Sequence, residues 1–174
     1  MKIKKVLISE KSIRKRVAEL GAQITADYKD SGRGLLFIGI LRGSVVFYAD
    51  LVRKINRNVH FDFMSVSSYG TSSETTGEVK ILKDLDCSIE NKDVIIIEDI
   101  IDTGLTIEFL KKMLLPRKPN SLKICCLLDK PSRRKANIEA EYTGFKIKDE
   151  FVVGYGMDYA QEFRNLPYIG IPEI

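Results

Sequence analysis

Apolar and polar residues alternate at helix spacing in some segments of the chain and at strand spacing in others. From Ser9 to Tyr28, apolar residues recur every three or four positions, which predicts an amphipathic helix with Ser9 as its N-cap. The β-branched run at residues 94–97 indicates a strand buried on both faces of a parallel sheet. The same patterns predict helices at residues 44–55 and 104–115 and strands at residues 35–41, 59–66, 122–128, 151–154 and 168–171. Because helices and strands alternate through the first two-thirds of the chain, we expect an α/β fold with a mostly parallel central sheet flanked by helices.

Length and composition limit the classes of protein that the chain can form. Its 174 residues, 44% hydrophobic and 30% charged, match one soluble globular domain spanning residues 1–174. No apolar stretch approaches the roughly 18 residues of a membrane span, and because the basic start is followed by no apolar h-region we expect no secretory signal. Three cysteines imply no disulfide framework, so we expect a cytoplasmic protein with no membrane partner. The single histidine, His60, excludes a histidine-rich metal site, and the net charge of +4 is compatible with an anionic substrate or with an ordinary surface.

An acidic string and a threonine-rich turn directly follow the strand predicted at residues 94–97. Glu98, Asp99 and Asp102 come first, and a helix then begins near Gly104. Ligands of open α/β sheets bind beyond the carboxyl ends of the strands, where carboxylates attract cations or sugar hydroxyls. Backbone N–H groups and hydroxyls at the start of the helix would form a phosphate cradle, made of Thr103, Gly104, Leu105 and Thr106. The alternative is that these residues only cap the helix, with Asp102 as its N-cap.

The run from Val94 to Gly104 resembles the phosphoribosyl-pyrophosphate (PRPP) binding motif of the type I phosphoribosyltransferases. Four further pieces occur in the order of the hypoxanthine-guanine group of this family, so the resemblance covers most of the chain from about Ile38 onward. These pieces are Leu41-Arg42-Gly43-Ser44, Ser68-Tyr69-Gly70, Leu128-Asp129-Lys130, and Phe151-Val152-Val153-Gly154-Tyr155 followed by Asp158-Tyr159 and Phe163-Arg164. The resemblance implies the type I phosphoribosyltransferase fold, with a small hood and a flexible lid loop.

The resemblance also implies an activity in purine salvage. The enzyme would transfer the 5-phosphoribosyl group from PRPP to hypoxanthine or guanine, giving IMP or GMP and pyrophosphate. Its cofactor would be Mg²⁺, and it would form a homo-oligomer of two or four chains. Residues 67–78 form a long polar segment, which inside a compact domain is typical of a lid. The lid would close with Ser68 and Tyr69 over the site and exclude water.

Roles at the sugar and phosphate end follow from the resemblance. Asp102 would be the catalytic base, which takes a proton from the imidazole ring of the purine. PRPP would be bound by Glu98, Asp99, Asp102, Thr103, Gly104, Leu105 and Thr106. The pyrophosphate would be bound by Leu41, Arg42, Gly43 and Arg164, with a non-proline cis peptide bond before Arg42. Leu105 occupies a position where some relatives carry a lysine, so the backbone must hold the phosphate without that charge.

At the purine end, Lys130 identifies the base most clearly. An ammonium donates to an exocyclic carbonyl but cannot accept from an amino group, which favours 6-oxopurines over adenine. The resemblance implies purine contacts from Lys130, Phe151, Val152 and Asp158, and metal contacts from Glu98, Asp99 and Asp158. From composition alone, Lys130 fits a surface lysine equally well and Phe151 fits a core residue.

Two other functions remain as alternatives. A regulatory nucleic-acid binder would use the basic residues near Arg14 and at 133–135, but no basic stripe interleaved with aromatics occurs, so we expect no nucleic-acid partner. Transfer to adenine or orotate is disfavoured by Lys130 together with Phe151 and Val152. The cluster Arg133-Arg134-Lys135 matches no catalytic motif, and we interpret it as a solvated loop.

Overall fold

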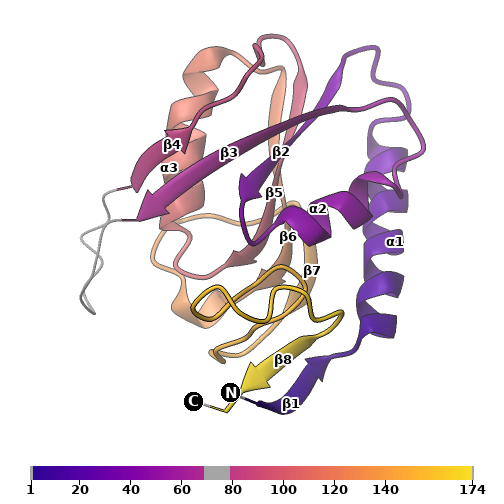
Figure 1. Cartoon of the computed structure of the whole chain (residues 1–174). Coiled ribbons are helices and arrows are strands. Elements are labelled where there is room, and N and C mark those ends of the chain that lie inside the picture. Colours follow the sequence, from indigo (N-terminus) through magenta and orange to yellow (C-terminus); the bar gives the residue numbers. More distant parts are fainter. Residues whose placement is uncertain (1, 69–78, 174) are drawn as a thin grey trace.

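The centre of the molecule is a six-stranded sheet (Figure 1). The structure is a computed structural model that describes residues 2–68 and 79–173. The strands are β2 (Leu35–Leu41), β3 (His60–Ser68), β4 (Val79–Lys83), β5 (Asp93–Ile101), β6 (Ser121–Asp129) and β7 (Tyr142–Lys146). They lie in the order β4-β3-β2-β5-β6-β7, and only β4 pairs antiparallel with its neighbour. The prediction of a mostly parallel sheet is therefore confirmed.

Helices cover both faces of this sheet. Helices α1 (Glu10–Asp27) and α2 (Val45–Val52) pack on one face, and α3 (Leu105–Leu114) packs on the other. Side chains alternate along each strand, so Phe37 of β2 joins the core beneath α1 and α2, while Leu36 joins the core beneath α3. The hydroxyl of Ser9 accepts the Ser12 N–H at 3.2 Å, which confirms Ser9 as the N-cap of α1. No helix in the described part of the chain has both the length and the apolar character that a membrane crossing requires.

The two ends of the chain pair beyond one end of the central sheet (Figure 1). Strand β1 (Ile3–Ile8) lies antiparallel to β8 (Ile169–Pro172), which confirms the strand predicted near residue 168. The strand predicted at residues 151–154 is wrong, because this segment forms only isolated bridges, from Val153 to Gly170 and from Gly154 to Met157. Positive φ angles at Gly154, Tyr155 and Gly156 prevent a regular strand there and bring Gly156 against Gly43, in the loop after β2.

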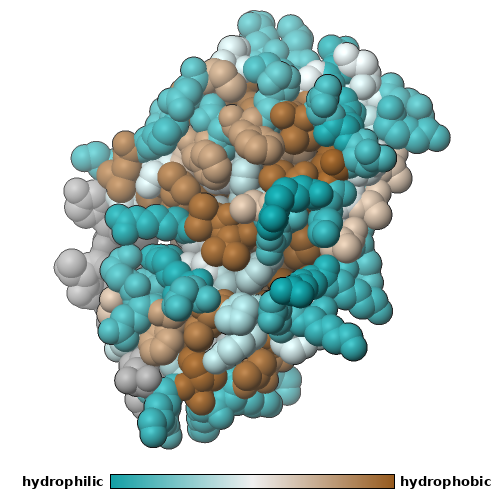
Figure 2. All heavy atoms as spheres, turned by 45° about the vertical axis from the view of Figure 1, so that its right-hand side comes forward, coloured by the Kyte–Doolittle hydropathy of each residue, from teal (hydrophilic) through white to brown (hydrophobic). Residues whose placement is uncertain are grey.

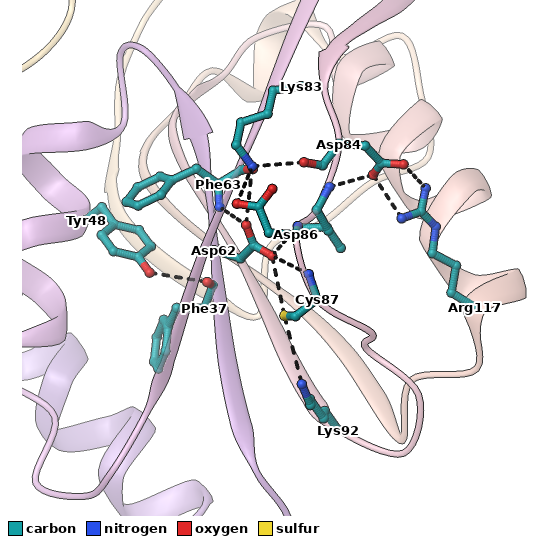
Figure 3. A network of polar contacts seen from close by, with 11 residues as sticks. Phe37, Tyr48, Asp62, Phe63, Lys83, Asp84, Asp86, Cys87, Lys92 and Arg117 are labelled. Carbon is teal, nitrogen blue, oxygen red and sulfur yellow. Dashed lines mark hydrogen bonds and ion pairs between the residues drawn. The ribbon is translucent and has the colours of Figure 1, made fainter.

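At the edge of the sheet, a buried carboxylate of β3 binds the end of β4 and the turn that follows it (Figure 3). Asp62 is 5% exposed and accepts hydrogen bonds from the N–H groups of Phe63, Asp86 and Cys87, at 2.7, 2.9 and 3.3 Å. The Lys83 ammonium lies 3.6 Å from the same carboxylate. Burial alone would raise the pKa of Asp62, but these hydrogen bonds outweigh it and hold the pKa below its ordinary value. The network therefore stabilises the turn that follows β4 against β3.

Candidate active site

The residues predicted to form the site gather at the carboxyl ends of three neighbouring parallel strands. β2 ends at Leu41, β5 ends at Ile101, and β6 ends at Asp129, directly before Lys130. β5 is longer than predicted, so Glu98 and Asp99 belong to the strand itself. This edge of the sheet is where ligands of α/β folds bind.

Two adjoining cavities open at this edge. The larger has a volume of about 340 Å³ and is lined by Arg42, Gly43, Asp99, Ile100, Asp102, Lys130, Phe151, Val152, Met157, Asp158 and Arg164. The smaller has a volume of about 80 Å³ and is lined by Glu98, Ile100, Ile101, Asp102, Thr103, Gly104, Thr106 and Ile107. Ile100 and Asp102 line both, so the cavities meet at Asp102. Leu41 and Leu105 were predicted as site residues, but they line neither cavity.

The smaller cavity contains the start of α3. Gly104 is the N-cap and has a left-handed φ of 82°, so the alternative role of Asp102 as the N-cap is wrong. The Leu105 N–H donates to the Thr103 hydroxyl at 3.4 Å, and the Leu105 side chain packs against the core. The first N–H groups of a helix have no partner within it and lie at its positive end. A phosphate group fits the chemistry of this cavity.

Two desolvated carboxylates lie beside this helix start. Burial and the neighbouring Asp99 raise the pKa of Glu98 well above its ordinary value, and the Glu98 Oε2 atom is buried without a hydrogen-bond partner among the described residues. Burial raises the pKa of Asp99 to about 6, opposed in part by the Ile100 N–H and by Arg164. Gly43 allows the Asp99 carboxylate to approach the loop after β2, because a Cβ at this position would lie 1.6 Å from Asp99 Oδ2. Sugar hydroxyls or a cation would stabilise both carboxylates.

The carboxylates do not form a complete metal site. Across residues 2–68 and 79–173, no three His, Cys, Asp or Glu side chains are arranged to hold an ion together. Glu98 and Asp99 nevertheless fit Mg²⁺, which proteins bind through one or two carboxylates while the substrate's phosphates and waters complete the shell. Asp158, the third predicted metal contact, is instead paired with Arg164 at 2.7 Å.

Two arginines predicted to bind pyrophosphate are linked by a residue that the sequence did not indicate. The Arg42 guanidinium donates to Gln161 Oε1 at 3.1 Å, and Arg164 donates to the same oxygen at 3.3 Å. Arg164 also donates to the Gly156 carbonyl at 2.8 Å. The peptide bond between Leu41 and Arg42 is cis, as the resemblance implies. These contacts hold the loop after β2 against the segment that contains Gly156.

The interpretation of residues 133–135 as a solvated loop is right in that Arg133 and Lys135 are exposed, but it misses the contacts that the two arginines make. A short helix of the 3₁₀ type, η2 (Pro131–Arg133), turns the chain back over the loop between β5 and α3. The Arg133 Nε atom lies 2.8 Å from Asp102 Oδ1, and Arg134 donates to the Asp102 carbonyl at 2.8 Å while pairing with Asp129. These contacts join segments that are distant in sequence, so no local pattern could have predicted them.

The purine end of the larger cavity combines a buried cation with an exposed aromatic ring. Lys130 is only 7% exposed, so it is not a surface lysine. Phe151 is 47% exposed and meets the Tyr159 ring edge-on at 5.8 Å, so it is not a core residue either. Val152 beside it is buried. Ser68 is the last residue of β3, and Tyr69 lies outside the described residues, as does most of the predicted lid.

A larger hollow, of about 590 Å³, lies between α1, α2 and residues 164–167. Figure 2 brings the side of the molecule that carries α1 forward, and hydrophobic residues gather in the middle of that face among hydrophilic ones. Two of the arginines that line the hollow are paired with carboxylates of its own lining, Arg14 with Glu10 and Arg53 with Asp50. Arg164 is the only predicted site residue that lines it, so the hollow is not the candidate active site.

Comparison with known proteins identifies the class to which this fold and site belong. The model of the phosphoribosyl transferase domain family matches residues 7–160, and the chain belongs to this family. Within it, the chain is 60% identical over 168 residues to the hypoxanthine-guanine phosphoribosyltransferase of Staphylococcus epidermidis, covering 97% of this chain and 93% of that protein. The family resemblance found in the sequence is thereby confirmed.

Solved structures agree with this assignment. The crystal structure of a hypoxanthine phosphoribosyltransferase from Staphylococcus aureus has a TM-score of 0.93 at 56% identity, covering 98% of this chain and 92% of that one. The Trypanosoma cruzi hypoxanthine phosphoribosyltransferase in complex with the product IMP has a TM-score of 0.92 at 40% identity, covering 98% and 95% of the two chains. The expected type I phosphoribosyltransferase fold is confirmed.

Proposed function

We infer that the chain transfers the 5-phosphoribosyl group from PRPP to hypoxanthine or guanine in purine salvage, giving IMP or GMP and pyrophosphate. The observation that carries this inference is the pair of cavities that meet at Asp102. The smaller cavity offers a helix N-terminus and the buried Glu98 carboxylate, and the larger offers a buried lysine and an exposed aromatic ring. A phosphorylated sugar and a flat heterocycle with a carbonyl group fit the two cavities in turn.

The smaller cavity would hold the phosphoribosyl group. Its 5′-phosphate would accept hydrogen bonds from the N–H groups at the start of α3, from Thr103 to Thr106. The ribose, at the junction of the two cavities, would donate its hydroxyls to Glu98 of the smaller cavity and to Asp99 of the larger one, whose desolvated carboxylates gain the most from such partners. Mg²⁺, when bound with PRPP, would neutralise charge on the pyrophosphate.

The larger cavity would hold the purine and the leaving pyrophosphate. The Lys130 ammonium would donate to the oxygen at C6, a contact that adenine lacks. The Phe151 ring would stack on the purine, and its exposed surface supports this role over a core role. The guanidinium groups of Arg42 and Arg164 would bind pyrophosphate oxygens through paired N–H donors.

Asp102 would act as the general base. Its side chain is 40% exposed, and its buried Oδ1 atom lies 2.8 Å from Arg133 Nε. The exposed part of the carboxylate would accept the proton of the purine imidazole ring as the opposite ring nitrogen attacks the sugar. The position of Asp102 between the two cavities supports this role.

We also propose that the chain works in the cytoplasm as a homo-oligomer. The three cysteines are free thiols, and burial raises the pKa of both Cys125 and Cys126, which fits reduced side chains that pack in the core. Light scattering on the purified protein would test the oligomer, and a mass of one chain would contradict it.

The activity is tested by following pyrophosphate release from PRPP and Mg²⁺ with each base in turn. We expect release with hypoxanthine and with guanine, and much slower release with adenine. Equal rates with adenine would refute the selection by Lys130, and no base-dependent release would refute the function. An RNA titration in the same buffer tests the nucleic-acid alternative, which is weakened because Arg133 and Arg134 are paired with carboxylates.

A further inference from the structure

Four side chains of alternating charge form a row beside the larger cavity. The Lys130 ammonium lies 3.7 Å from Asp149 Oδ1, Asp149 Oδ2 lies 3.2 Å from Arg133 Nη1, and Arg133 Nε lies 2.8 Å from Asp102 Oδ1. Lys130 and Asp102, at the two ends of the row, line the cavity, whereas Arg133 and Asp149 do not. The row thus connects, from outside the cavity, the two groups that would contact neighbouring atoms on one edge of the purine, its oxygen at C6 and the imidazole nitrogen that loses the proton.

The Lys130 ammonium needs a counter-charge because its side chain is only 8% exposed. Asp149 is the carboxylate in reach, but 3.7 Å is too long for a hydrogen bond. No other acceptor among the described residues hydrogen-bonds the ammonium. Asp149 therefore balances the charge of Lys130 and leaves its N–H donors free for a ligand.

Arg133 fixes Asp149 in place. Its planar guanidinium contacts Asp149 through Nη1 and Asp102 through Nε, so one rigid group sets the separation of the two carboxylates. Without Arg133, the half-exposed Asp149 side chain would turn into solvent and Lys130 would lose its neighbour.

We propose that Asp149, held by Arg133, is a positioning residue that aims the Lys130 ammonium at the oxygen at C6 of the incoming purine. This inference rests on the proposed function and deepens it, because it assigns the selection of 6-oxopurines to a pair of residues outside the cavity. Neither residue needs to contact the substrate. Their effect is on the binding of the base and not on the binding of PRPP.

The test compares steady-state kinetics of the unaltered chain with Asp149→Asn, Asp149→Glu and Arg133→Gln. Asp149→Asn should raise the KM for hypoxanthine about 10-fold, the change that a loss of about 1.4 kcal/mol of binding free energy produces. The kcat and the KM for PRPP should stay within about 2-fold, and Asp149→Glu should restore most of the base affinity. Arg133→Gln should raise the same KM and also lower kcat, because Asp102 loses its neighbour too. Glu150→Gln is the matched control, since it removes one negative charge from the adjacent residue.

The outcomes separate this proposal from the proposed function. If the unaltered chain is active and Asp149→Asn has the same KM for hypoxanthine as Glu150→Gln, the positioning role is refuted and the function stands. If Asp149→Asn lowers kcat and raises both KM values together, the residue is structural and the proposal is also refuted. If the unaltered chain transfers nothing to any 6-oxopurine, the function fails and this proposal fails with it.

Discussion

Asp99 should destabilise the protein in the absence of substrate, and the size of the effect follows from its surroundings. Burial raises the pKa of its carboxyl from 3.8 to about 6, against the opposing effects of the Ile100 N–H and Arg164. Between about pH 4 and pH 6 the native state therefore keeps a proton that the unfolded chain releases. The free energy of unfolding falls as the pH rises through this range, and above pH 6 the cost reaches up to about 3 kcal/mol.

Asp99→Asn removes the charge and keeps an oxygen that can accept the Ile100 N–H. We expect the variant without ligand at pH 7.5 to have a free energy of unfolding up to about 3 kcal/mol above that of the unaltered chain. The difference should disappear below about pH 4, where Asp99 is protonated in both states. Urea denaturation at a series of pH values measures it.

Asp158→Asn is the matched control for this experiment. Its carboxylate lies 2.7 Å from Arg164, so the substitution removes an ion pair, and we expect no gain in stability. The reasoning is refuted if Asp99→Asn brings no gain at pH 7.5, or if its gain is the same at pH 4. The stabilised variant should also bind PRPP more weakly, because its ribose contact is altered.

Three further substitutions have defined outcomes. Asp102→Asn should lower kcat by about 100-fold or more and leave the KM for PRPP nearly unchanged, and equal turnover would remove Asp102 from the mechanism. Gly43→Ala should raise the KM for PRPP, because the new methyl group displaces the Asp99 carboxylate, and unchanged kinetics would contradict that packing. Asp62→Asn should destabilise the protein at pH 7 by about 2 kcal/mol in urea denaturation, because a buried acceptor network is broken. Because folding lowers the pKa of Asp62, the loss of unfolding free energy caused by this substitution should shrink as the pH falls below about 4. A loss that does not change with pH would contradict the role of the charged carboxylate.

The central strands could be predicted from the sequence because their burial is visible in it. A strand covered on both faces, such as β5, is a nearly continuous apolar run. Strands β1, β4 and β7 were missed because they are short and mix polar with apolar residues. In β4, an edge strand of the sheet, Leu82 is exposed, so burial and hydrophobicity do not coincide there.

The candidate site likewise has a part that is visible in the sequence and a part that is not. The acidic string and the turn at Gly104 are contiguous, so the sequence shows a strand end, carboxylates and a helix start together. Arg133 ends the short helix η2, and Asp149 and Gln161 lie in loops. Their contacts depend on how distant segments meet, and their residue types are common on any surface. The sequence could therefore indicate what the site binds, but not which residues hold its groups in position.

A crystal structure of the protein with IMP tests the central claim most directly. The claim is that the two cavities meeting at Asp102 bind the phosphoribosyl group and the purine. The account predicts the phosphate at the N–H groups of Thr103 to Thr106, the base against Phe151, and its carbonyl oxygen within hydrogen-bond distance of the Lys130 ammonium. Binding of IMP elsewhere, or with its carbonyl oxygen away from Lys130, would contradict the account.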